Sequence, residues 1–116
     1  MEHRWGRRIA AKIPIRLIPE VGEPVIGETE NISFSGALVQ TARSVRLWAH
    51  LQVEVILPCE LGGGPERVAA HVTRKIRDGA AIEWCDFAPY AVRALLLALD
   101  PLGARAASRE TPPDQR

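Results

Sequence analysis

"RVAAHVTRKIRDGAAIEW", residues 67–84, is the stretch that most clearly indicates the fold. Apolar and polar side chains alternate through both of its halves, which is the pattern of half-buried β-strands. The inward positions are then Val68, Ala70, Val72, Ile76, Ala80, Ile82 and Trp84. Asp78-Gly79, between the two halves, is a strong signal for a two-residue hairpin turn. The stretch therefore predicts two antiparallel strands with one face toward a core.

Four further segments extend this sheet. Residues 51–57 alternate in the same way, and residues 11–18 place apolar side chains on one face, although Pro14 cannot donate to a strand ladder. We therefore expect an edge strand or a bulge at Pro14. Residues 24–33 and 36–41 complete six strands. The apolar positions predicted to face the core in these segments are Ile13, Ile15, Leu17, Leu51, Val53, Val55 and Leu57.

The chain changes period after the strands. In residues 89–100, apolar side chains recur at helical spacing, Pro89 suits a first turn, and Pro101 marks the stop. The predicted inward positions of this helix are Val92, Leu95, Leu96 and Leu99. The fold class is thus mainly β: a six-stranded antiparallel barrel or strongly curved sheet, with one C-terminal helix covering an open end or packing against the rim. Ligands bind such barrels at the outer wall or mouth, because side chains fill the interior.

Composition is consistent with one globular domain. The 116 residues are 47% hydrophobic and 25% charged, which is ordinary for a folded chain. The basic N-terminus is followed by no apolar signal-peptide core, and no run approaches the ~20 apolar residues of a membrane span. We expect a cytoplasmic protein without membrane insertion. Cys59 and Cys85 lack a CxxC or a nearby histidine pair, so they predict no metal or redox site, although a disulfide stays open.

The net charge of +1 hides a local basic cluster. Residues 1–16 contain five basic side chains and one acid, whereas residues 17–42 contain four glutamates and no base. A general nucleic-acid binder spreads lysine and arginine over a whole face. A small anionic ligand suits the local cluster better. We therefore expect no nucleic-acid partner, and scarce aromatics also weaken the alternative of single-stranded nucleic-acid binding on the barrel.

"NISFSG", residues 31–36, is a polar break between two predicted strands, and it suits either a plain turn or a small binding surface. Arg4 and Arg8 form an RxxxR, and 22 residues separate Arg8 from Asn31-x-Ser33-x-x-Gly36. This combination resembles the PilZ domain, a family of six-stranded β-barrels that bind the bacterial second messenger cyclic di-GMP. The resemblance extends over about residues 2–99, with Glu2 before the arginines and "GAAIEWCDF" at the sixth strand.

The resemblance implies a two-part site for cyclic di-GMP. Arg4 and Arg8 would pair with a phosphate or with guanine O6 and N7, while Asn31 and Ser33 would satisfy a guanine edge or a phosphate oxygen. Gly36 would adopt a positive φ or let the ligand approach the backbone.

Two neighbours of the matched arginines are open to more than one interpretation. Arg7 would add a phosphate contact or only solvate the arm. Trp5 would stack on a guanine, pin the arm to the barrel or cover an apolar patch.

The resemblance also implies a function. We expect a flexible arginine-rich arm at residues 1–9, a barrel with its helix at residues 10–100 and a disordered tail at residues 101–116. Cyclic di-GMP would order the arm and change the face offered to an unidentified protein partner. No cofactor is expected, and no nucleophile-and-base constellation indicates an enzyme. The alternative is a ligand-independent adaptor that binds another protein through the barrel and helix.

Overall fold

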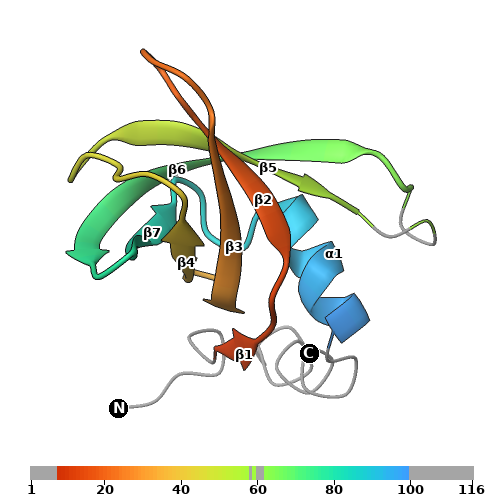
Figure 1. Cartoon of the computed structure of the whole chain (residues 1–116). Helices are drawn as coiled ribbons and strands as arrows, with labels where there is room; N and C mark the ends of the chain where they lie inside the picture. The colour runs from red at the N-terminus through yellow and green to blue at the C-terminus, as the bar shows by residue number, and fades with distance from the viewer. Residues whose placement is uncertain (1–7, 58, 60–61, 100–116) are drawn as a thin grey trace.

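Six strands close into an antiparallel barrel because β3 (Val25–Ile32) and β4 (Gly36–Thr41) pair with each other in addition to their other neighbours in the sheet. The computed structural model describes residues 8–57, 59 and 62–99 (Figure 1). Around the barrel the order is β3, β2, β5, β6, β7, β4. The strands are β2 (Pro14–Pro19), β3 (Val25–Ile32), β4 (Gly36–Thr41), β5 (His50–Ile56), β6 (Pro65–Ile76) and β7 (Gly79–Trp84). The predicted barrel is confirmed, and the C-terminal helix is α1 (Tyr90–Leu99).

The hairpin of β6 and β7 is present, but its turn lies one residue earlier than predicted. Ile76 pairs with Gly79, so the two turn residues are Arg77 and Asp78, and Asp78 has a φ of 62°. Gly79 belongs to β7 instead, where a methyl group would collide with the Val39 carbonyl oxygen of β4. Glycine is required here by the close approach of two strands.

The short strand β1 (Ile9–Ala10) was not predicted. It pairs with the end of β3, beyond the stretch where β2 pairs with the beginning of β3. The expectation of an edge strand or bulge at Pro14 was wrong, because β2 pairs with both β3 and β5. Pro14 is tolerated as the first residue of β2, since pairing with β5 starts only at Arg16.

One aliphatic core fills the barrel and includes the inner face of α1. Nearly all predicted inward positions of the strands are buried, while Ile13 and Ile76 are half-buried. The helix buries Ala91, Val92, Ala94, Leu95 and Leu96. Leu99, predicted to face the core, is instead 41% exposed at the last turn. Within the described part of the chain, no helix is long and apolar enough to cross a membrane. Both cysteines are free and exposed.

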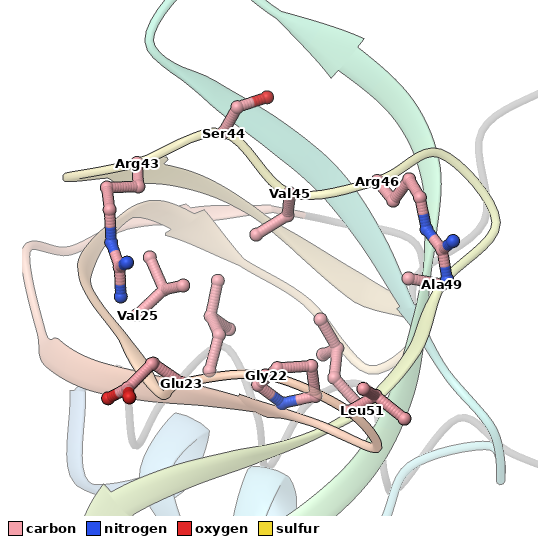
Figure 2. Close-up of a pocket in the computed structure, with 12 residues that line it drawn as sticks. Gly22, Glu23, Val25, Arg43, Ser44, Val45, Arg46, Ala49 and Leu51 are labelled. Atoms are coloured by element: carbon pink, nitrogen blue, oxygen red, sulfur yellow. The ribbon is translucent and has the colours of Figure 1, made fainter.

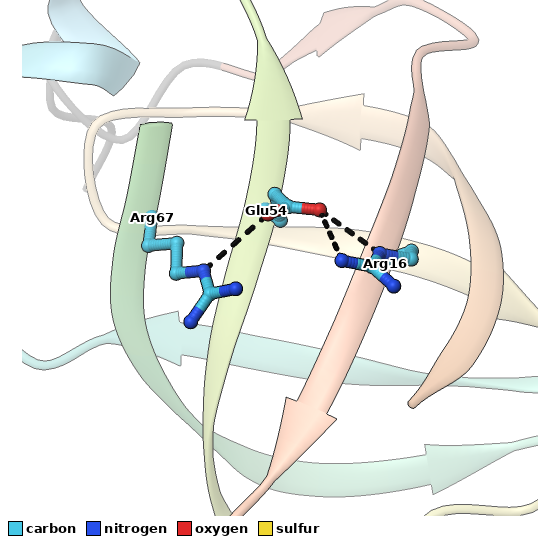
Figure 3. A network of polar contacts seen from close by, with 3 residues as sticks. All are labelled: Arg16, Glu54 and Arg67. Atoms are coloured by element: carbon cyan, nitrogen blue, oxygen red, sulfur yellow. Dashed lines mark hydrogen bonds and ion pairs between the residues drawn. The ribbon is translucent and has the colours of Figure 1, made fainter. Parts of the chain in front are cut away.

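An ionic network crosses three strands on the outer wall (Figure 3). Arg16 of β2 approaches Glu54 of β5 with Nη2 2.7 Å and Nε 2.9 Å from Oε1. Arg67 of β6 places Nε 3.4 Å from Oε2 of the same carboxylate. The hydrogen bond from Arg16, helped by the charge of Arg16 and by Arg67, lowers the pKa of Glu54 below its usual value. The carboxylate therefore links β2, β5 and β6 as long as it is ionised.

This network predicts an acid-sensitive contribution to stability. Because the pKa of Glu54 is lower in the folded than in the unfolded chain, the contribution is present above about pH 4.5 and is lost as pH falls through the folded value. Glu54→Gln should therefore be less stable than wild type at neutral pH and approach it in acid. Urea unfolding between about pH 7 and pH 3 measures this. Exposed Glu66→Gln is the control, and parallel losses in wild type and Glu54→Gln would contradict the assignment.

Candidate functional site

A β-bulge in β3 turns Asn31 toward the outer wall. Thr29 lies opposite Val39 and Asn31 lies opposite Leu38, so Glu30 is an extra residue on β3. Thr29 and Ile32 both face the core, with 3% and 2% exposure. In an uninterrupted strand, residues 29 and 31 would share one face. The bulge reverses that alternation, and Asn31 becomes available on the outside of the barrel.

Arg8 and Asn31, from the two sequence motifs, are in direct contact. Ile9 and Ala10 of β1 pair with Ile32 and Asn31 of β3, which places the preceding residue beside the Asn31 side chain. Arg8 Nη1 donates a hydrogen bond of 2.9 Å to Asn31 Oδ1, and the pair is exposed. The structure thus joins the end of the RxxxR motif to the start of the NxSxxG motif.

Thr29 fixes the segment that follows Arg8. Its buried Oγ1 accepts a 2.9 Å hydrogen bond from the Ile13 amide and donates to the Ala11 carbonyl oxygen. The Ala11 amide in turn donates to the Glu30 carbonyl oxygen at 3.2 Å. Sequence reasoning missed this positioning role. The available signal was a hydroxyl residue at an inward position of a predicted strand, where a buried polar group needs a partner.

The chemistry of the Arg8–Asn31 pair suits an acceptor-rich anion. A guanidinium has no acceptor, so Asn31 must use its carbonyl oxygen toward Arg8. The Arg8 guanidinium and the Asn31 amide therefore offer a ligand chiefly N–H donors. Arg8 adds its positive charge. Phosphate oxygens and the O6 and N7 acceptors of guanine both match this pattern.

Ser33 lies inside the turn that follows Asn31, with 0% exposure. Its hydroxyl accepts from the amides of Ser35 and Gly36 at 3.2 and 3.3 Å, and it lies 3.2 Å from the Gly36 carbonyl oxygen. The Ser33 amide donates to that same carbonyl at 2.8 Å. These bonds are those of a serine that shapes a turn. A direct ligand contact by Ser33, as predicted, would require the turn to rearrange.

Gly36 is required by the packing of β4 against β7. It is buried, and a methyl group at this position would collide with the Ile82 carbonyl oxygen. Its φ is not among the positive values found in the described chain, so that part of the prediction was wrong. Glycine stands here because two backbones approach closely.

The end of β7 and the segment entering α1 hold the turn in place. The Trp84 indole Nε1 and backbone amide donate to the carbonyl oxygens of Ser33 and Ser35, each at 3.0 Å. The Ala88 amide donates to the Phe34 carbonyl oxygen, also at 3.0 Å. Trp84, predicted only as a core aromatic, therefore also fixes the turn. The backbone carbonyl oxygens of Ser33, Phe34 and Ser35 therefore all accept a hydrogen bond.

The remaining predicted site residues, Arg4, Trp5 and Arg7, lie outside the described residues. The arm was expected to end at residue 9. In the structure, Ile9 already belongs to β1 and pairs with Ile32 of β3. Near Asn31, the Glu30 carboxylate accepts a hydrogen bond from Gln40 of β4. Among residues 8–57, 59 and 62–99, no group of three or more His, Cys, Asp or Glu side chains is arranged to hold a metal ion.

Comparisons with known proteins agree with this architecture. A family model described as "PilZ domain" matches residues 2–99. A crystal structure of the PilZ domain of CeSA, from a cellulose-synthesizing bacterium, is similar with a TM-score of 0.61 and 19% sequence identity. The alignment covers 83% of this chain and 97% of that one. At such low identity the likeness shows a shared fold. A search of curated proteins found no match.

The hydrogen bonds of Ser33 predict a loss of stability when its hydroxyl is removed. Ser33→Ala leaves two amides of the turn without their acceptor, which should lower the free energy of unfolding by about 1–3 kcal/mol. Urea unfolding measures the change. The exposed Ser44→Ala serves as control and should stay within about 0.5 kcal/mol of wild type. A Ser33→Ala variant as stable as this control would refute the turn-shaping role.

Proposed function

The chain belongs to the PilZ domain family, and from this premise we propose that it is a receptor for cyclic di-GMP that signals to a protein partner. PilZ domains are generally receptors for this nucleotide and act as binding or adaptor modules. The observation that carries the proposal is the contact between Arg8 and Asn31. It joins the two motifs in one exposed, positively charged surface of hydrogen-bond donors.

The ligand offers the groups that this surface lacks. Cyclic di-GMP has two phosphates and two guanines, all rich in acceptor atoms. Arg8 can pair bidentately with a phosphate or with guanine O6 and N7, and the Asn31 amide nitrogen can donate beside it. Charge-assisted hydrogen bonds contribute about 1.5–3 kcal/mol each. A few of them suffice for a micromolar dissociation constant, about −8 kcal/mol.

The arm adds the second part of the site in this proposal. Arg4 and Arg7 supply further guanidinium donors, and the Trp5 indole stacks on a guanine, which is worth about 1–3 kcal/mol for a base on an aromatic ring. Binding then holds the arm against the outer wall of the barrel beside β3. The surface presented to a partner changes as a result, which is how the nucleotide signal would be passed on.

Ser33 and Gly36 support the proposed site indirectly, by fixing the backbone next to Asn31. Their hydrogen bonds and close packing hold the turn that directly follows Asn31. The motif therefore acts through two kinds of residue: Asn31 meets the ligand, and the serine and glycine fix the backbone that carries it.

A ligand-independent adaptor is the second candidate. The observation that favours it is a group of large apolar side chains exposed on α1 and on the segment entering it, namely Phe87, Tyr90, Leu97 and Leu99. Exposed apolar groups of this kind commonly mark protein interfaces. An adaptor would bind its partner equally with and without cyclic di-GMP, whereas a receptor would not.

Isothermal titration calorimetry with cyclic di-GMP tests the receptor proposal. Wild type should bind, and Arg8→Ala should weaken the affinity by at least about tenfold, because one or more charge-assisted hydrogen bonds are lost. Asn31→Ala should weaken it by a similar factor. The matched control is Arg93→Ala, which removes an exposed arginine of α1 that belongs to neither motif and should leave the affinity unchanged. Absence of heat from wild type at saturating nucleotide would refute the proposal.

A further inference from the structure

A pocket of about 510 Å³ opens at the end of the barrel remote from the Arg8–Asn31 pair (Figure 2). It is lined by residues of the β2–β3 turn, of the β4–β5 loop and of the adjoining strands, among them Val25 at the start of β3. Asn31 lies near the other end of the same strand, which is eight residues long. The pocket is thus separated from the proposed nucleotide site by nearly the length of β3.

The floor of this pocket is apolar. Leu17, Val25, Val45 and Leu51 line it, and all four side chains are buried. Figure 2 shows the side chains of Val25, Val45 and Leu51 turned toward one another across it. Its size falls within the range of sites that hold a small molecule or a few side chains.

The β4–β5 loop adds positive charge to one side of the mouth. Arg43 and Arg46 line the pocket, and residues 42–51 contain no acidic side chain. Arg43 Nη2 donates to the Pro24 carbonyl oxygen at 3.0 Å, which holds its guanidinium across the opening. Lys75 of β6 adds a third cation to the same loop, with Nζ 2.6 Å from Ser44 Oγ.

Large apolar side chains are exposed on the two segments that form the mouth. Val21 in the β2–β3 turn is 89% exposed, and Leu47 and Trp48 in the β4–β5 loop are also exposed, Trp48 by 62%. Trp48 has a φ of 66°, a left-handed conformation that is strained for a bulky residue. The Trp48 amide donates to the Val72 carbonyl oxygen at 2.8 Å, and the Val72 amide donates to the Ala49 carbonyl oxygen at 3.0 Å. The barrel therefore holds this backbone in place while the indole stays in solvent, and such strain is concentrated at functional sites.

We infer that this mouth surface, made of the pocket and of the adjacent exposed Leu47 and Trp48, docks an acidic segment of a partner protein that inserts one apolar side chain into the pocket. A small ligand in the pocket would leave the exposed Leu47 and Trp48 uncovered, whereas a protein segment covers both the pocket and these two side chains. The carboxylates of that segment pair with the basic side of the mouth. Glu23 of the facing turn also lines the pocket, so the carboxylates of the segment approach on the side of Arg43 and Arg46.

This inference specifies the partner half of the proposed function and does not depend on the nucleotide half. The two surfaces lie at different ends of β3 and share no residue. Each can therefore be tested, and can fail, separately.

Fluorescence anisotropy with labelled synthetic peptides tests the inference. The probe is a peptide of about twelve residues with four glutamates around one central phenylalanine. Two matched peptides replace the glutamates by lysine or the phenylalanine by serine. The full-length protein should bind the acidic apolar peptide at least about tenfold more tightly than either control, since both the charge and the apolar anchor contribute.

Two variants locate the binding. Trp48→Gly removes the indole and suits the positive φ, so the chain should stay folded while peptide affinity falls about tenfold. Arg46→Glu reverses one charge of the mouth and should weaken binding about fivefold or more. The controls are Ile56→Ser, an exposed apolar residue of β5 outside the pocket lining, and Arg93→Glu on α1. Neither control should change the peptide affinity.

Three outcomes would overturn the inference: equal binding of all three peptides, peptide affinity unchanged by both mouth variants, or binding to phosphatidylglycerol vesicles in preference to the peptide. Titration of the same samples with cyclic di-GMP separates the two proposals. Peptide binding without nucleotide binding refutes only the receptor. Nucleotide binding without peptide preference refutes only the docking surface.

Discussion

The β-bulge at Glu30 is the constraint on which the rest of the structure depends. One extra residue in β3 allows Thr29 and Ile32 both to face the core while Asn31 faces outward between them. Without it, the alternation of the strand would direct Asn31 inward, away from the ligand. The bulge is located where β3 exchanges its partner from β2 to β1, and the buried Thr29 hydroxyl binds the chain that connects the two. Arg8 reaches Asn31 because this connection is fixed.

A single strand therefore connects two surfaces with different chemistry. At its end, β3 carries the donor-rich Arg8–Asn31 pair, which suits phosphate and guanine acceptors. At its beginning, Val25 lines an apolar pocket flanked by Arg43 and Arg46. Because the surfaces share no residue, the proposed nucleotide and the proposed protein segment would not compete for the same side chains.

The sequence was sufficient to predict the barrel. In residues 51–57 and 67–84, apolar and polar side chains alternate because each strand buries only one of its faces. Through the resemblance of their motifs to a family, it also predicted Arg8 and Asn31 as site residues, and the structure brings these two side chains into contact. It did not reveal the bulge, since nothing local marks Glu30 as an extra residue. The role of Gly36 was likewise hidden, because it arises from close packing against β7, which lies far along the chain. The exposure of Leu99 depends on where the helix leaves the barrel, and the periodicity of the sequence does not predict that position.

The central claim is that Arg8 and Asn31 act as one unit in recognising the nucleotide. A double-mutant cycle for cyclic di-GMP affinity, with Arg8→Ala, Asn31→Ala and the double variant, tests it most directly. If the pair is one unit, the double variant should bind about as weakly as either single variant, with a coupling energy of roughly 1 kcal/mol or more. Strictly additive losses would contradict the claim, because they would mean that the two side chains meet the ligand independently or that only one of them does.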